Sequence, residues 1–284
     1  MAGRGFVASF VASPKAMAGL LLVLAILAAA LLSSLLAPFD PQLQSLADRL
    51  LPPFSQAGDG SFHLLGTDQL GRDLLSRLVY GARVSLLVGL GASLLAGLVG
   101  VLLGLAAGYL GGWVDDLVTR LADVQLALPY ILLAIAMLAI LGGSLVNIIL
   151  VLSLAQWVTY TRVVRSGVLS IREREYVLAA RALGIAPVMI MLRHILPNVL
   201  APVIVIATFA VAQSIVAEAG LSFLGLGVPP SVPSWGGMLA DARSYLVIAW
   251  WLAAIPGLAI TVTVIGVNLL GDWLRDRFDP RLGV

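Results

Sequence analysis

The feature that most constrains this chain is a series of long segments without Asp, Glu, Lys or Arg. A helix needs about 20 apolar residues to cross the hydrocarbon core of a bilayer, because each residue rises about 1.5 Å. The charge-free segment 124–161 is too long for one helix, and Gly142, Gly143 and Ser144 divide it. The sequence therefore predicts six spans, at residues 16–36, 84–110, 124–141, 145–160, 199–217 and 248–270.

Composition leads to the same fold class, an all-α integral membrane protein. Hydrophobic residues make up 60% of the 284 residues and charged residues 11%, whereas soluble domains carry about 25% charged residues. So few charges could not cover the surface of a soluble enzyme. The first span follows Arg4 and Lys15, as a signal peptide would, but its apolar run is longer than a signal peptide's core. We expect a retained anchor.

The chain lacks the residue types of several kinds of site. It has no cysteine and only two histidines, His63 and His194. These numbers exclude a disulfide framework and a thiolate zinc site, and we expect neither a metal site nor catalytic residues.

The arginines and the single lysine predict the orientation. With a cytoplasmic N-terminus, 12 of the 17 basic residues fall in cytoplasmic segments, as the positive-inside rule requires. Both termini are then cytoplasmic, and residues 37–83 and 218–247 lie outside. The chain divides into residues 1–83, an anchor span with an extracytoplasmic loop, and residues 84–284, a core that contains a cytoplasmic loop at 161–198.

The second span carries a stripe of small residues at every fourth position. Such a stripe lets another helix approach closely. Packing within this subunit is the favoured interpretation, and contact with a partner subunit is the alternative. The stripe consists of Ala92, Ala96, Gly100, Gly104, Gly108 and Gly112.

The cytoplasmic loop 161–198 predicts a helix, a turn and a second helix. Ser170 and Glu173 have the spacing of a capping box. Gly184 stands where a helix C-terminal glycine belongs, with Arg181 in the last turn. Pro187 suits the first turn of a second helix that stops near Pro197.

The first of these helices carries apolar residues at helical spacing, Tyr176, Ala179, Ala180 and Leu183. This face suits docking into a groove of another protein. An amphipathic helix on the membrane surface is an equally good interpretation of periodicity alone.

The same segment resembles a known motif. Residues 175–184 read EYVLAARALG and residues 193–198 read RHILPN. This resembles the EAA loop of ABC-importer permeases, with Leu178 and His194 departing from the general pattern. Both departures are similar to the dipeptide/oligopeptide/nickel branch of the family, in which the glutamate stands earlier, here at Glu175.

Other stretches resemble the second permease subunit of that branch. They are LGTDQLGRDLLSR from residue 65, LSFLGLG from residue 221, SWG from residue 234 and NLLGDWLRDRFDP from residue 268. The resemblance extends from about Pro41 to Leu282. It implies a permease that forms half of a pore for di- and oligopeptides, with nickel or a metal chelate as the variant substrate.

The resemblance also implies partners and roles. The partners are a second permease, one or two cytosolic ATPase subunits that bind ATP and Mg, a solute-binding protein and membrane lipid, in the bacterial cytoplasmic membrane. The helix that contains the motif is the coupling helix, which docks into the ATPase. By this resemblance, the residues that dock or orient the helix are Glu175, Tyr176, Ala179, Ala180, Arg181 and Gly184. The residues that attach it to the fifth span are Arg193, His194, Pro197 and Asn198.

The absence of a P-loop agrees with a non-catalytic subunit. The only lysine, Lys15, lies in SPKA, outside any GxxxxGK[ST] pattern. An ion-coupled carrier is the alternative of another class, but it would usually place charges within its spans. An intramembrane enzyme has no supporting motif, since neither GxSxG nor HExxH occurs.

A few charges outside the motif remain open. Glu218 follows the fifth predicted span and is a candidate for the substrate pathway. Asp68, Arg72 and Asp73 either fix the first extracytoplasmic loop, which we favour, or contact a binding protein.

Overall fold

The computed structural model describes residues 6–278 and is built almost entirely of helices. The long helices are α2 (Pro14–Leu31), α4 (Leu74–Leu110), α7 (Leu145–Ile171), α10 (Leu196–Phe223) and α12 (Trp251–Phe278). The shorter ones are α1 (Phe6–Val11), α3 (Ser33–Leu36), α5 (Gly112–Leu126), α6 (Tyr130–Leu141), α8 (Glu175–Ala182), α9 (Pro187–Met189) and α11 (Trp235–Ala242). Two 3-10 turns, η1 (Leu46–Asp48) and η3 (Arg243–Tyr245), a π-helical turn η2 (Ile190–Ile195) and a two-stranded antiparallel ribbon of β1 (Ser55–Gln56) and β2 (Phe62–His63) complete it.

Five segments are long and apolar enough to cross a membrane by length and composition. They are α2, α4, α7, the run from α9 through α10, and α12. Their positions agree with five of the six predicted spans. A sixth crossing requires the bent pair α5 and α6 to act as one span.

The third predicted span, 124–141, is wrong as a single helix. α5 ends at Leu126, α6 begins at Tyr130, and the two helices meet at an angle of 87°. Pro129 accounts for the break, because proline offers no N–H to the preceding turn and disfavours helical backbone at the residue before it.

Other predicted boundaries also fall short of the helices, since α10 ends at Phe223 rather than at residue 217 and α12 at Phe278 rather than at residue 270. α4 begins at Leu74 rather than at residue 84, and α7 continues to Ile171 rather than ending near residue 160. The charges that limited these two predicted spans, Arg83 and Arg162, lie within the helices. Arg83 donates to the hydroxyl of Ser33 at 3.4 Å, and Arg162 pairs with Asp123 at 2.7 Å. A charge-free run therefore marks the apolar part of a helix and not its ends.

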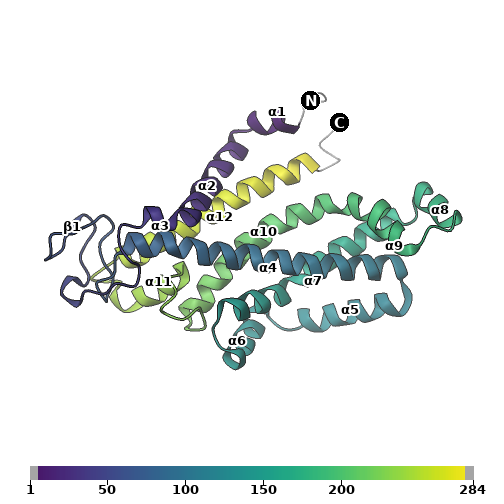
Figure 1. Cartoon of the computed structure of the whole chain (residues 1–284). Helices are drawn as coiled ribbons and strands as arrows, with labels where there is room; N and C mark the ends of the chain where they lie inside the picture. The colour runs from purple at the N-terminus through teal and green to yellow at the C-terminus, as the bar shows by residue number, and fades with distance from the viewer. Residues whose placement is uncertain (1–5, 279–284) are drawn as a thin grey trace.

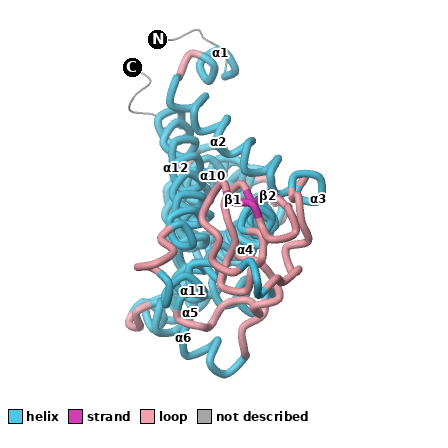
Figure 2. Tube along the Cα trace, turned by 90° about the vertical axis from the view of Figure 1, so that its left-hand side faces the viewer, coloured by secondary structure: helices cyan, strands magenta, loops and turns pink. Residues whose placement is uncertain are grey.

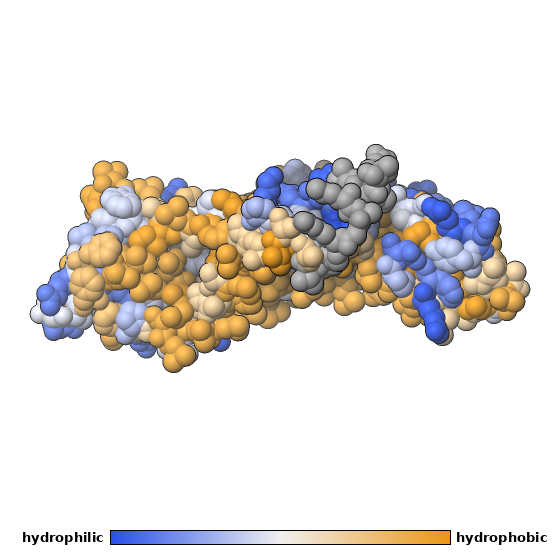
Figure 3. Space-filling view, turned by 90° about the horizontal axis from the view of Figure 1, so that it is seen from above, coloured by the Kyte–Doolittle hydropathy of each residue, from blue (hydrophilic) through white to orange (hydrophobic). Residues whose placement is uncertain are grey.

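The helices run broadly along one direction and give the molecule two distinct ends (Figure 1). α2 and α12 lie side by side, and α7 packs along α4. One end, which we call the loop end, holds α3, α11 and the loop 37–73 with its short ribbon (Figures 1 and 2). The opposite end, the coupling end, holds α8 and α9. In Figure 3, hydrophobic residues predominate between the two ends, hydrophilic residues gather toward both ends, and a further hydrophilic group lies beside the grey atoms.

The small-residue stripe of α4 packs against α7 within this subunit. A Cβ added at Gly104 would come within 2.7 Å of the Cβ of Val164, and one at Gly108 equally close to the Cβ of Val168. The favoured interpretation of the stripe is therefore confirmed from Ala92 to Gly108, whose residues are buried. Gly112 is different, because it is exposed and lies beyond the end of α4.

Candidate coupling site

The first helix of the coupling end begins later than its predicted cap. α8 begins at Glu175, and its N-cap residue, Arg174, makes no side-chain capping bond. Ser170 is still inside α7, so the capping box of Ser170 and Glu173 is wrong. α7 continues this far because Val164 and Val168 bury completely in a cluster with residues of α4 and α10, and this packing outweighs a local capping signal.

The C-terminus of α8 is the turn that the sequence predicted. Gly184 has a φ of 75°, in the left-handed region. Its N–H donates to the carbonyl of Arg181 at 3.0 Å, and the N–H of Ile185 donates to the carbonyl of Ala180 at 3.2 Å. This pair of bonds defines a Schellman motif. A Cβ at Gly184 would meet nothing within 4 Å, so backbone conformation rather than space favours glycine here.

The predicted apolar face of α8 divides into two faces. Val177 and Ala180 point inward and are 0% and 5% exposed. Tyr176, Ala179 and Leu183 point outward, and Leu183 is 81% exposed. The inner face joins a buried cluster of Leu105, Val164, Val168, Ile190, Ile195 and Val199. α8 is therefore held on the helix bundle by one side while the other side stays open.

Arginine side chains fix α8 and the preceding turn to the end of α4. The guanidinium of Arg181 lies 5.4 Å from the ring centre of Tyr109, a cation–π contact. Arg172 donates from Nη1 to the carbonyl of Gly108 at 2.9 Å. Glu175 is exposed in the first turn of the helix, where its negative charge interacts favourably with the positive end of the helix dipole and stabilises the helix.

The second part of the coupling end leads into α10 without a stop. Pro187 stands in the first turn of α9, as predicted. The stop predicted near Pro197 is wrong, since α10 begins at Leu196 and Pro197 lies in its first turn. Because Pro197 has no N–H to donate, regular α-helical bonding fails just before it. The N–H of Leu196 bonds instead to the carbonyl of Met191, which gives the π-helical turn η2.

Asn198 links this junction back to α8. Its Nδ2 donates to the carbonyl of His194 at 2.7 Å and lies 3.5 Å from the hydroxyl of Tyr176. Arg193 is exposed, while Nδ1 of His194 is buried without a hydrogen-bond partner among residues 6–278. The structure thus brings the predicted site residues together at one end. The docking role that the resemblance implies for them stays a prediction.

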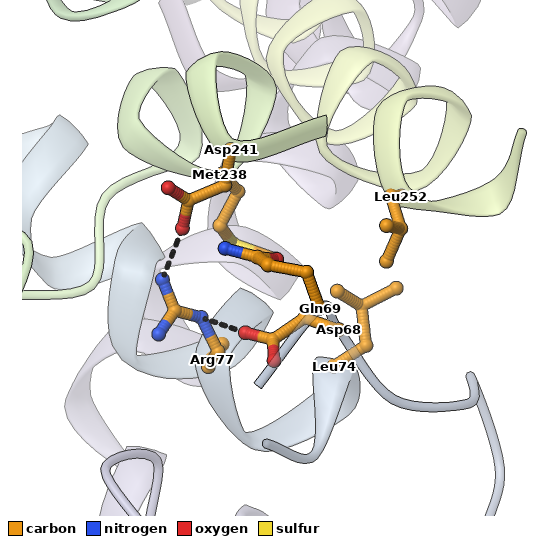
Figure 4. Close-up of a pocket in the computed structure, with 7 residues that line it drawn as sticks. All are labelled: Asp68, Gln69, Leu74, Arg77, Met238, Asp241 and Leu252. Carbon is orange, nitrogen blue, oxygen red and sulfur yellow. Dashed lines mark hydrogen bonds and ion pairs between the residues drawn. The ribbon is translucent and has the colours of Figure 1, made fainter. Parts of the chain in front are cut away.

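The loop end contains a buried ion-pair network. Asp68 Oδ2 lies 2.6 Å from Nε of Arg72 and 3.4 Å from Nε of Arg77. Asp241, on α11, accepts from both arginines at 3.1 and 3.3 Å. The side chains of Asp68 and both arginines are at most 6% exposed. Figure 4 shows Arg77 between Asp68 and Asp241. The network joins the loop, α4 and α11.

This network agrees with the favoured role of the loop charges. Asp68 and Arg72 are buried among their partners, and Asp73 caps α4 through its bond to the N–H of Ser76 at 2.7 Å. The other oxygen of Asp73 lies 2.8 Å from Nδ1 of His63. All three residues therefore hold the loop in place. Sequence reasoning missed Arg77 and Asp241, which stand 164 residues apart without any shared motif.

Glu218 lies inside α10 and not after a span. It is 0% exposed, and one of its oxygens accepts from the hydroxyl of Ser222 at 2.7 Å. The other oxygen, Oε2, is buried without a partner in the described part of the chain. In this conformation Glu218 faces the interior of the subunit, near Gly236 of α11, so the geometry gives its predicted pathway role no support.

Two family models match the sequence. The model described as the binding-protein-dependent transport system inner membrane component matches residues 100–284. The model described as the N-terminal TM domain of oligopeptide transport permease C matches residues 3–53. Together the matches include the first span, the coupling end and α11.

Curated relatives and solved structures agree with these matches. The chain is 45% identical over 279 residues to the di/tripeptide transport system permease protein DppC of Pseudomonas aeruginosa, covering 98% of this chain and 92% of that one. It is 41% identical to the glutathione transport system permease protein GsiD of Pectobacterium atrosepticum, covering 98% and 91%. A chain of the inward-facing MetNI methionine ABC transporter superposes with a TM-score of 0.58 at 19% identity, covering 72% and 97%, and shows the shared fold.

Proposed function

Because this chain belongs to the family of binding-protein-dependent transport system inner membrane components, we propose that it is the permease subunit of an ATP-driven importer of di- and oligopeptides. It forms half of the translocation pore and transmits the ATPase movement to it. It carries out no bond chemistry itself.

The observation that carries this proposal is similarity along nearly the whole chain to a peptide permease. The 45% identity to the di/tripeptide permease extends over 98% of this chain. The glutathione permease is almost as similar, so the proposal covers short peptides as a class. Nickel or a metal chelate is the variant to test beside them.

The geometry of the coupling end supports the mechanical part. α8 is held by its buried face and by Arg181, while Tyr176, Ala179 and Leu183 remain exposed. We infer that this open face docks into a cytosolic ATPase subunit. Movement of α8 then reaches α10 through a short connection, since only the turn 183–186, α9 and η2 separate the two helices.

The remaining parts of the assembly belong to the same proposal. A second, related permease completes the pore, a solute-binding protein docks at the loop end, and ATP and Mg bind only to the ATPase partners. The coupling end and both termini lie in the cytoplasm. The excess of arginine in the predicted cytoplasmic segments supports this orientation.

The test is to purify the tagged chain from its native membrane in mild detergent and to reconstitute what copurifies. We expect a second permease and ATPase subunits, and ATP-dependent uptake of dipeptides in the presence of the binding protein. Recovery of the chain alone, or uptake driven by an ion gradient without ATP, would overturn the proposal.

A pair of substitutions locates the ATPase contact. Leu183→Glu places a charge on the open face of α8, where Leu183 is 81% exposed, and should release the ATPase subunits. Leu46→Glu is the matched control at the loop end, where Leu46 is 66% exposed. If both variants retain the ATPase equally, α8 is not the docking helix.

A further inference from the structure

One side of α10 is exposed and is not typical of a lipid-facing surface. Five of its exposed residues are spaced by three, four and eleven positions, and these intervals keep them on one face of a helix. Leu200 and Ile204 are exposed on another side of the helix, and Phe223 is exposed at its end. The five include two amides, a proline and a glycine. The pathway face, as we call it, consists of Asn198, Pro202, Gln213, Val216 and Gly220.

Gln213 is the most informative member of this face. It lies well inside α10, exposed, and the described residues offer it no hydrogen bond. An amide in hydrocarbon without a partner costs several kcal/mol, so lipid is an unsuitable neighbour. α4 shows the contrast, because its exposed residues Leu94, Leu98 and Leu102 are purely apolar.

The neighbouring helix α7 adds polar groups at the same level. Gln156 donates from Nε2 to the hydroxyl of Ser214, the residue after Gln213, at 2.7 Å. Its Oε1 is buried without a partner within residues 6–278. Thr159, three residues further along α7, is exposed. Two adjoining helices therefore present uncharged polar side chains in the middle of the bundle.

The pathway face also connects the two ends of the molecule. It begins at Asn198, beside Tyr176 of the coupling helix. Beyond Gly220 lies a cavity of about 310 Å³, whose lining includes Ser222, Arg77 and Asp241. The face thus leads from the coupling end toward a cavity at the loop end, with amide side chains at Asn198 and Gln213 and no charged residue.

From these contacts we propose that the pathway face of α10 lines the water-filled passage for the substrate, and that Gln213 contacts the peptide backbone halfway through. The inference rests on the proposed function and deepens it. The face carries no charge, so it neither repels nor traps a charged peptide. An amide both donates and accepts hydrogen bonds, and therefore matches the backbone of a peptide of any sequence.

The absence of native cysteine makes a direct test possible. We would prepare single-cysteine variants Gln213→Cys and Val216→Cys in the reconstituted complex. Leu94→Cys, on the apolar face of α4, and Val88→Cys, which is 0% exposed, serve as controls. The probe is a charged, membrane-impermeant methanethiosulfonate, and modification of this chain is measured by mass, with and without nucleotide.

We expect the two pathway-face cysteines to react at least about tenfold faster than both controls in one nucleotide state, and a dipeptide substrate to slow the reaction at position 213. Failure of both cysteines to react in every state would overturn the inference and place lipid or a second subunit on this face. Rapid reaction without slowing by dipeptide would overturn the contact assigned to Gln213.

Uptake on the same vesicles separates this inference from the proposed function. ATP-dependent dipeptide uptake with inaccessible cysteines would leave the proposed function intact and refute the pathway face. If the cysteines are accessible but the complex imports no peptide, the proposed peptide substrate is wrong, whereas the assignment of a water-filled passage along this face still holds. Gln213→Leu, which keeps bulk and removes the amide, should lower uptake of dipeptides several-fold, and equal uptake would contradict the backbone contact.

Discussion

The loop end and the coupling end of this subunit are stabilised in opposite ways. At the loop end, two arginines and two aspartates pair with one another, three of them almost wholly buried. At the coupling end, α8 buries two small apolar side chains and exposes Tyr176 and Leu183. The charged groups of the loop-end network find their partners within this chain, whereas the outer face of α8 stays exposed.

This difference indicates where a substitution should affect folding and where it should affect coupling. A buried charge that loses its partner destabilises the fold itself. A change on a helix held mainly by one small face alters orientation without unfolding the bundle. Four substitutions test this division.

The largest effect should follow from Asp68→Ala. Asp68 is the shared partner of Arg72 and Arg77 at the loop end, and its loss leaves both buried guanidinium groups with fewer acceptors. Removal of one partner from a buried pair costs about 3–5 kcal/mol. Thermal unfolding in detergent measures it. Asp116→Ala, an exposed aspartate beyond the end of α4, is the control, and equal unfolding temperatures for the two variants would refute the comparison.

Gly184→Val should act on coupling and spare folding. The φ of 75° forces a β-branched residue into strain of about 1–2 kcal/mol, a factor of about 5–30 in the population of the native turn. We expect the bundle to unfold at its usual temperature and ATP-dependent uptake to fall sharply. Gly184→Asn is the matched variant, because asparagine tolerates this conformation. Equal losses in both variants would exclude backbone strain as the cause.

Asn198→Ala should have a smaller effect at the same end. It removes the 2.7 Å bond to the carbonyl of His194, worth about 0.5–1.5 kcal/mol. Hydrogen exchange of the amides in η2 and the first turn of α10 should quicken, while those of α11 stay unchanged. Tyr176→Phe removes only an exposed contact of 3.5 Å and should leave exchange as it is. Faster exchange in α11 would show that the ends are not independent.

The smallest effect concerns pH at the loop end. The N–H of Gly58 and the hydroxyl of Ser45 donate to Asp48 and lower the pKa of its carboxyl below the ordinary value. A lowered folded-state pKa gives a contribution that is complete above about pH 4 and is lost as pH falls through the folded value. Asn at position 48 has no carboxyl to protonate, so the Asp48→Asn variant lacks this pH-dependent contribution. Acidification should therefore reduce the protease resistance of the loop slightly less in the variant than in the native chain. Parallel pH profiles would contradict this assignment.

Local signals predicted the parts of the fold that depend on local geometry. Gly184 and Pro187 fix backbone conformation by their own chemistry, and the structure has both where the pattern required them. The small residues of α4 predicted close packing correctly, because Gly104 and Gly108 leave room for Val164 and Val168.

Signals that compete with packing were less informative. Ser170 and Glu173 have the spacing of a cap, but the buried valines of α7 carry the helix past them. Pro129 interrupts the third predicted span, although counting charges alone overlooks it. No spacing rule joins Asp68, Arg77 and Asp241, since only tertiary packing brings them together.

The loop-end network has a consequence for biosynthesis. Arg77 leaves the ribosome 164 residues before Asp241, a delay on the order of 10–30 s at about 5–20 residues per second. Until α11 is made, the two arginines have only Asp68 among their network partners. Closure of the network is therefore a late event that requires the C-terminal third of the chain, and a truncated or stalled chain would display an incomplete charge cluster to the quality-control machinery of the membrane.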